Sequence, residues 1–157
     1  MPAARGFTLI ELVVTVAILG VLAMLAVPML EVTAQRQKET QLRSALRDIR
    51  TAIDAYHQAV LDKKIAAAAD ASGYPPDLDA LTRGVPDLTR PDNRPIYFLR
   101  RLPRDPFHPE QAAPAAETWG LRSYASAPDA PQAGEDVFDV YSLSGRKGLN
   151  GVAYREW

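Results

Sequence analysis

The feature that most constrains this chain is an uncharged apolar run near its N-terminus. Residues 12–30 contain no Asp, Glu, Lys or Arg, and most are Val, Leu, Ile, Ala or Met. At about 1.5 Å of rise per residue the run would form a helix about 28 Å long, close to the roughly 30 Å hydrocarbon core of a bilayer. We therefore expect one membrane-spanning helix, with the rest of the chain forming a domain on the far side.

The composition of this segment leaves two ordinary interpretations open. A secretory signal peptide also has an apolar core, but it is removed at a small-x-small site, and Met24-Leu25-Ala26 is a poor one. Glu11 would also interrupt its apolar region. A plain membrane anchor would keep the helix without processing. Arg5 is the one charged residue before Glu11, so we expect the short N-terminus to be cytoplasmic.

The residues before the apolar run form a motif. Gly6-Phe7-Thr8-Leu9-Ile10-Glu11, after a short basic leader, resembles the class III signal of type IV pilin-like proteins. The resemblance implies a leader over residues 1–6, cleavage by a prepilin peptidase between Gly6 and Phe7, and N-methylation of Phe7. It also implies that residues 7–30 are retained as a helix that spans the membrane and later forms a filament core.

Glu11 places a carboxylate at the head of this apolar helix. A charge in mid-membrane costs on the order of 2.5–3.5 kcal/mol, so the carboxylate needs a partner. The resemblance implies that the partner is the α-amino group of Phe7 on a neighbouring subunit, which makes Glu11 an assembly residue. Snorkelling of Glu11 to lipid headgroups is the simpler alternative. Further along, Gly20 and Pro28 weaken the helix, and Pro28 predicts a kink.

Beyond Leu30 the sequence becomes amphipathic without a turn signal, and we expect a helix over residues 31–70. Apolar residues recur at intervals of four and three and define one helix face: Leu42, Leu46, Ile49, Ile53, Tyr56 and Val60. The spacing also suits a coiled coil, but it lasts less than three heptads. Packing of this face against a sheet is the preferred interpretation.

Residues 71–157 are predicted to form a globular part with short C-terminal strands. Residues 75–84 suit a helical turn with Leu78 and Leu81 facing inward, and residues 110–117 are expected to form an exposed loop. Strand patterns occur at 121–125 and 137–143, and a third strand is expected at 96–99 or 152–155. So few short strands are not stable alone. The fold class is therefore α+β, a long N-terminal helix packed on a small antiparallel β-sheet, in a pilin-like arrangement.

The C-terminal half narrows the resemblance. The blocks YPP, LDAL, LPRDPF, WGLRSY and FDVYSL occur in the order found in the major pseudopilins of type II secretion systems. Two features depart from that family. Residues 108–118 are an insertion whose role the sequence does not indicate. The acidic calcium-binding loop expected after YSL is replaced by a segment that contains Arg146 and Lys147.

Because these two cations would repel Ca²⁺, we predict that the calcium site of the family is absent and that the chain holds no cofactor. Four acidic residues nearby offer a weaker cluster, although solvated loop charges explain them more simply: Asp129, Glu135, Asp136 and Asp139.

The sequence lacks the patterns that indicate catalysis. It contains no cysteine, glycine-rich phosphate loop or serine nucleophile elbow, and His57 and His108 have no partners at metal-ligand spacing.

Residues 100–104 (RRLPR) are basic, but they lack interleaved aromatic residues and the net charge is −1, so nucleic acid is not an expected partner. An exposed face that contacts a neighbour suits this segment better. We expect a protein that is not an enzyme.

The resemblance implies a pseudopilin, a structural subunit of a periplasmic filament that drives type II protein secretion. It would lie in the inner membrane as a single-pass protein with a periplasmic C-terminal domain. Its partners would be membrane lipid, prepilin peptidase, an inner-membrane assembly platform, other pseudopilins and further copies of itself. The alternatives are a type IV pilin or minor pilin of a surface or DNA-uptake filament, and a lone membrane-anchored periplasmic binding domain.

Overall fold

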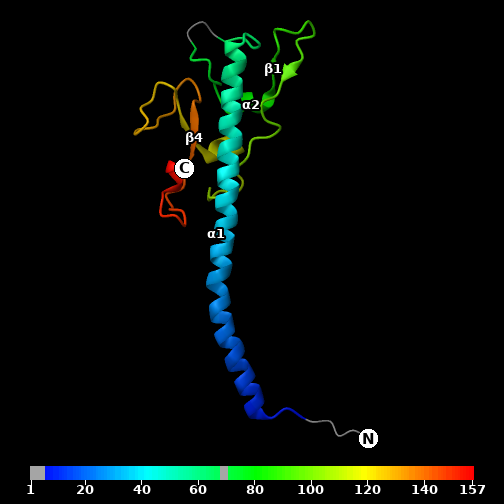
Figure 1. Cartoon of the computed structure of the whole chain (residues 1–157), viewed down its shortest axis with the longest axis vertical. Coiled ribbons are helices and arrows are strands. Elements are labelled where there is room, and N and C mark those ends of the chain that lie inside the picture. The colour runs from blue at the N-terminus through cyan, green and yellow to red at the C-terminus, as the bar shows by residue number, and fades with distance from the viewer. Residues whose placement is uncertain (1–5, 68–70) are drawn as a thin grey trace. The chain divides into compact units, whose positions relative to one another are not determined.

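The computed structural model describes residues 6–67 and 71–157, without the side chains of 25–28. The chain divides into two compact units, one ending at Gln37 and one spanning Lys38–Trp157. One helix, α1 (Leu9–Leu61), contributes to both units (Figure 1). Most of the predicted leader lies outside the described residues.

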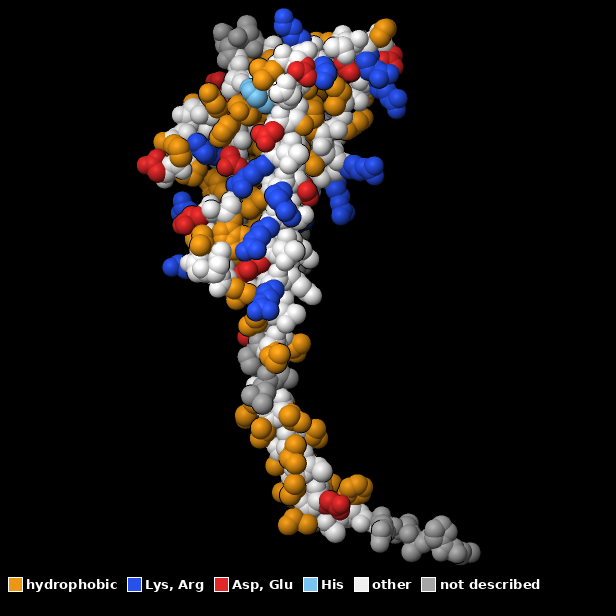
Figure 2. Space-filling view, in the orientation of Figure 1, with side chains coloured by type: hydrophobic (Ala, Val, Ile, Leu, Met, Phe, Trp, Pro, Cys, Tyr) orange, Lys and Arg blue, Asp and Glu red, His pale blue; other side chains and the backbone are white. Residues whose placement is uncertain are grey.

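In the first unit, α1 exposes its apolar side chains around its whole circumference. The large apolar side chains described between Phe7 and Val32 are all exposed, from 82% at Leu9 to 40% at Val32 (Figure 2). Such a helix needs lipid or other helices to cover it, and it is long and apolar enough to cross a membrane. The helix continues through Gly20 and Pro28. The side chain of Pro28 lies outside the described residues, so the kink stays a prediction.

In the second unit, the seam of α1 forms the core, as its spacing predicts. Leu42, Ile49 and Ile53 are fully buried, and Leu46 and Tyr56 are nearly so. Burial raises the pKa of the Tyr56 phenol, with a further contribution from Asp77. The seam packs within the same chain, so the coiled-coil alternative is not needed. Its partners come from the short elements of the C-terminal half: Leu78, Leu81, Phe107, Trp119, Val137, Val140 and Tyr154.

The end of α1 differs from the sequence prediction, which extends the helix over residues 31–70. The helix ends at Leu61, and Lys63 takes a left-handed conformation with φ 57°. The Lys64 amide donates to the Ala59 carbonyl and the Lys63 amide to the Val60 carbonyl, each at 2.9 Å. These two bonds form a Schellman motif, which satisfies carbonyls of the last turn and ends the helix before residue 70, the predicted end.

Among the described residues, four short strands form two separate two-stranded antiparallel sheets. The first pairs β1 (Val85–Pro86) with β2 (Pro95–Ile96), and the second pairs β3 (Trp119–Arg122) with β4 (Asp139–Ser142). In β4, Val140 and Ser142 are fully buried while Asp139 and Tyr141 are half-buried. The α+β class, with a long N-terminal helix and small antiparallel sheets, is confirmed.

Two local predictions for the C-terminal half are confirmed in part. Of the two positions named for a third strand, 96–99 overlaps β2 at Ile96. Residues 152–155 form no strand: a single bridge joins Lys147 to Ala153, and η2 (Tyr154–Glu156) follows it. The reason is that Tyr154 turns its ring into the core. Residues 110–117 are also not fully exposed. Ala113 is buried, its carbonyl accepts a bond from Arg104, and a 3₁₀ turn, η1 (Ala115–Thr118), closes the segment.

The helical turn predicted at residues 75–84 is confirmed as α2 (Ala80–Arg83). Leu78 and Leu81 are buried, as expected. The Asp77 carboxylate accepts the Ala80 amide at 2.7 Å and pairs with Arg83 at 2.9 Å, which fixes both ends of the turn.

Candidate functional site: the N-terminal motif and the C-terminal segment

The bond between Gly6 and Phe7 lies in an exposed, non-helical stretch before α1. Phe7 is 81% exposed, and no other part of the chain lies within 4 Å of the position that a Cβ would occupy at Gly6. An exposed peptide bond outside a helix is accessible to a peptidase. The sequence expected the helix to begin at Phe7, but it begins at Leu9, which leaves this bond outside the helical hydrogen-bond ladder.

Thr8 and Glu11 form a capping box at the start of α1. The Thr8 hydroxyl accepts the Glu11 amide at 3.3 Å, and a Glu11 carboxylate oxygen accepts the Thr8 amide at 3.3 Å. Each side chain therefore satisfies a backbone donor that has no partner within the helix. The Glu11 carboxylate therefore has a role within the chain itself.

Sequence reasoning from the motif alone missed this capping role. The signal was present, because Thr8-Leu9-Ile10-Glu11 matches the T-x-x-E pattern that precedes an apolar helix. The resemblance drew attention to the glutamate as an assembly residue, and its local function was overlooked.

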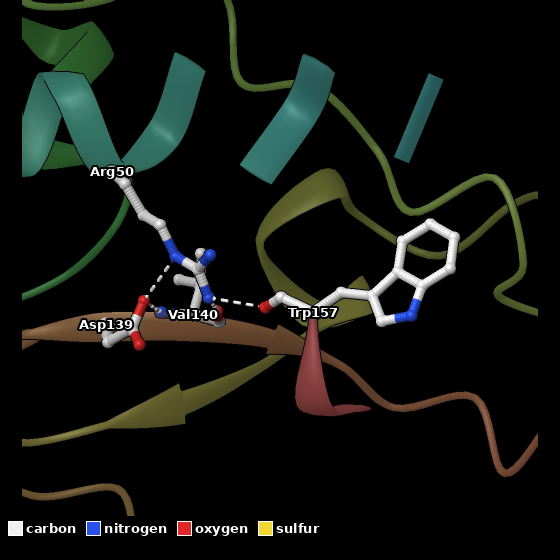
Figure 3. A network of polar contacts seen from close by, with 4 residues as sticks. All are labelled: Arg50, Asp139, Val140 and Trp157. Carbon is white, nitrogen blue, oxygen red and sulfur yellow. Dashed lines mark hydrogen bonds and ion pairs between the residues drawn. The ribbon is translucent and has the colours of Figure 1, made fainter. Parts of the chain in front are cut away.

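In the second unit, Arg50 joins α1 to the end of the chain (Figure 3). Its guanidinium donates to the Asp139 carboxylate at 2.7 Å, to the Val140 carbonyl at 3.1 Å and to a backbone oxygen of Trp157 at 2.9 Å. One side chain thus holds β4 and the C-terminal residue together against the helix. The planar guanidinium suits this role because it offers several donors in fixed directions.

Glu39, also on α1, holds the segment after β4 through Leu149 and Tyr154. It is a buried carboxylate, and one of its oxygens accepts the Leu149 amide at 2.8 Å and the Tyr154 hydroxyl at 3.0 Å. Within this segment the Gly148 amide donates to the Val152 carbonyl at 2.8 Å, which closes a tight turn. The segment that carries Arg146 and Lys147 is therefore ordered by protein contacts.

The four acidic residues considered as a weaker cation cluster do not converge. Asp139 pairs with Arg50, and Asp136 accepts the Tyr124 amide at 2.8 Å. Within residues 6–67 and 71–157, no group of three or more acidic or histidine side chains is placed to hold a metal ion. The absence of a calcium site stays a prediction.

The two histidines occupy different surroundings. His57 stacks on Tyr74 with ring centroids 4.1 Å apart, and His108 contacts the backbone of Glu110 in the insertion. Arg100 and Arg101 are exposed, whereas Arg104 donates to carbonyls of the insertion. None of these arrangements brings an acid, a base and a nucleophile together.

Comparison with known proteins agrees with the family resemblance seen in the sequence. The family described as the prokaryotic N-terminal methylation motif matches residues 1–27. The type II secretion system core protein G of Pectobacterium carotovorum is 31% identical, over 88% of this chain and 85% of that protein. The protein of the same name from Pseudomonas aeruginosa is also 31% identical, over 88% and 81%.

A shorter match reaches fimbrial proteins. The type IV major fimbrial protein FimA of Dichelobacter nodosus is 42% identical, but over only 40% of this chain and 38% of that protein. No solved structure matches. Because the similarity to the core G proteins spans most of both chains, the protein belongs to the type II secretion system core protein G family, the pseudopilins among the type IV pilin-like proteins.

Proposed function

We propose that this pseudopilin is cut between Gly6 and Phe7 by a prepilin peptidase, methylated on the new amino group of Phe7, and polymerised into a periplasmic filament that drives type II secretion. The accessible Gly6–Phe7 bond in front of a capped helix supports processing. The exposed apolar surface of α1 in the first unit supports both membrane insertion and later burial among other subunits. The insertion over residues 108–118 has no assigned role in this proposal.

In the membrane, the helix anchors the protein to the inner membrane and leaves the second unit in the periplasm. In the filament, the Glu11 carboxylate attracts the Phe7 amino group of a neighbouring subunit. The carboxylate that is costly in lipid becomes favourable in the polymer, because the low dielectric strengthens the attraction between opposite charges. The partners in assembly are further copies of this chain, other pseudopilins and an inner-membrane platform.

The decisive experiment is mass spectrometry of the N-terminal peptide of the protein purified from membranes. The expected mature N-terminus is N-methyl-Phe7, and a strain without prepilin peptidase should accumulate the precursor that begins at Met1. A mature protein that begins at Met1 in a peptidase-containing strain, or after Ala26, contradicts the proposal.

A second candidate is a type IV pilin of a surface filament, which the partial match to fimbrial proteins favours. It predicts the same N-terminus. The two are separated by immunogold microscopy, since a surface pilin gives long extracellular filaments at native expression and a pseudopilin does not.

A further inference from the structure

Six basic side chains come from the part of α1 that opens the second unit and from two loops, and we call them the cationic collar: Lys38, Arg43, Arg47, Arg104, Arg146 and Lys147. Lys38, Arg104 and Arg146 line a hollow of about 690 Å³. Arg43 and Arg47 line another, of about 550 Å³, to which Asn150 contributes. The loop over residues 146–150 therefore borders both hollows.

The collar contains more positive than negative side chains in both linings. The ion pairs found among the described residues use Arg50, Lys64, Arg83 and Arg90, and none uses a collar residue. Asp105 is the one acidic residue in the first lining, where it faces the three cations Lys38, Arg104 and Arg146. Its buried carboxylate accepts the Phe107 amide at 2.7 Å and the Ser142 hydroxyl at 2.5 Å. The second lining contains no acidic residue.

Neutral groups hold several of these cations in place without reducing their charge. The Arg43 guanidinium lies 4.3 Å from the centroid of the Trp157 ring, and that of Arg146 lies 5.5 Å from the Phe107 centroid. Arg104 donates to the carbonyls of Glu110 and Ala113. The collar is thus a positioned set of positive charges that retains its attraction for anions.

Exposed apolar side chains lie on the same loop as Arg146 and Lys147. Leu149 is 46% exposed and Val152 is 39% exposed, although the Leu149 backbone is held by Glu39. Cationic side chains beside exposed aliphatic ones are typical of surfaces that lie in the headgroup region of a bilayer.

The sequence limits how far Lys38 can lie from the apolar run. Lys38 comes eight residues after Leu30, the last residue of the apolar run. That length of chain reaches at most about 28 Å, and about 12 Å at the rise of a helix.

We propose that the cationic collar binds anionic phospholipid headgroups on the periplasmic face of the membrane while the subunit awaits assembly. This rests on the membrane anchoring in the proposed function.

The test uses the full-length protein in nanodiscs of phosphatidylcholine, with or without phosphatidylglycerol. The chain has no cysteine, so Gly145→Cys gives a single labelling position, and a side chain built there meets no atom within 4 Å. A nitroxide at residue 145 reports contact with nickel-chelating headgroup lipids by electron paramagnetic resonance. We expect strong contact with phosphatidylglycerol present, weaker contact without it, and loss of the difference at high salt.

The variant pair Arg146→Gln and Lys147→Gln should weaken the contact by about five-fold for each charge removed. The matched control is Arg100→Gln with Arg101→Gln, which removes the same charge from exposed positions outside the collar and should leave contact unchanged. Near-ultraviolet circular dichroism establishes that each variant is folded.

Equal contact in both lipid mixtures overturns the proposal. It is also overturned if both variant pairs lose contact equally, because net charge would then explain the effect. Cross-linking of residue 145 to a second copy, independent of lipid, would assign the collar to a subunit interface. None of these readouts depends on N-methylation, so a failure here is distinguishable from a failure of the proposed processing.

Discussion

The Glu11 carboxylate has two separable functions, one within a subunit and one proposed between subunits. Within a subunit it accepts the Thr8 amide and completes the capping box. Between subunits it supplies a negative charge opposite the amino group of Phe7. A capping acceptor needs an oxygen atom, whereas attraction to an ammonium group across an apolar interface needs the charge.

Glu11→Gln should therefore keep the helix start and abolish assembly. Glutamine caps a helix in this position as glutamate does, but it carries no charge. We expect N-methyl-Phe7 in this variant and in Glu11→Ala, as measured by mass spectrometry, with filaments absent from both by electron microscopy. Thr8→Ala is the matched control, since it loses part of the cap and keeps the charge. Normal filaments from Glu11→Gln would assign the residue to capping alone.

Arg50 should contribute more to stability than an ordinary surface arginine. It donates to one carboxylate and two backbone oxygens, and Arg50→Ala leaves these acceptors without that donor. We expect a loss of about 1–3 kcal/mol in the free energy of unfolding. Arg50→Lys should recover only part of it, because a single ammonium group cannot replace the planar guanidinium.

Denaturant unfolding in detergent micelles, followed by tryptophan fluorescence, measures this loss. Arg47→Ala is the matched control on the same helix, and its exposed side chain predicts a change within about 0.5 kcal/mol. Equal losses for Arg47→Ala and Arg50→Ala would mean that the contacts in Figure 3 add no stability.

The C-terminus of α1 is set by a residue poorly suited to its backbone conformation. Lys63 occupies the left-handed position of the Schellman motif, where glycine is strongly preferred. Lys63→Gly should therefore stabilise the second unit by about 0.5–1 kcal/mol, and Lys63→Val should destabilise it because a β-branched residue resists this conformation. Thermal unfolding followed by near-ultraviolet circular dichroism measures both. A lower melting temperature for Lys63→Gly would contradict this account of the helix end.

The pairing of β3 with β4 depends on the lack of a side chain at Gly120. A Cβ there would collide with the ring of Tyr141, which lies opposite in the strand register. Gly120→Ala is expected to cost about 1–3 kcal/mol. Gly145→Ala, where a Cβ meets nothing within 4 Å, should be close to neutral. Denaturant midpoints of the two variants measure the difference, and similar values would mean that the Tyr141 ring moves aside freely.

For the molecule as a whole, stability should not depend on calcium. The segment after β4 is held by Glu39 and by the Arg50 contacts to Asp139 and Trp157, and it carries two cations at Arg146 and Lys147. Treatment with EDTA should leave the unfolding temperature unchanged, and added calcium should not raise it. Calorimetry of the purified protein measures this. A drop in melting temperature with EDTA that calcium reverses would show a metal site that the contacts described here do not require.

Much of the architecture was predictable because it depends on local pattern. The apolar run, the seam beginning at Leu42 and the inward Leu78 and Leu81 all follow from hydrophobic periodicity, which is independent of distant residues. The predictions that differ from the structure concern the end of a helix and the place of a strand. The helix ends at Leu61 because a left-handed lysine is tolerated at residue 63. Of the two positions named for a third strand, 152–155 forms none because the core accommodates Tyr154, whereas 96–99 overlaps β2.

The order of residues alone determined that the chain has an apolar helix with an acidic residue at its head, a cleavage motif before it and an amphipathic continuation. Only the tertiary structure decided which distant groups meet: Arg50 with Asp139, and Glu39 with Leu149 and Tyr154. The physical reason is the range of each effect. Hydrophobic period and capping act over a few neighbouring residues, whereas a charged side chain finds its partner only after folding brings remote segments together.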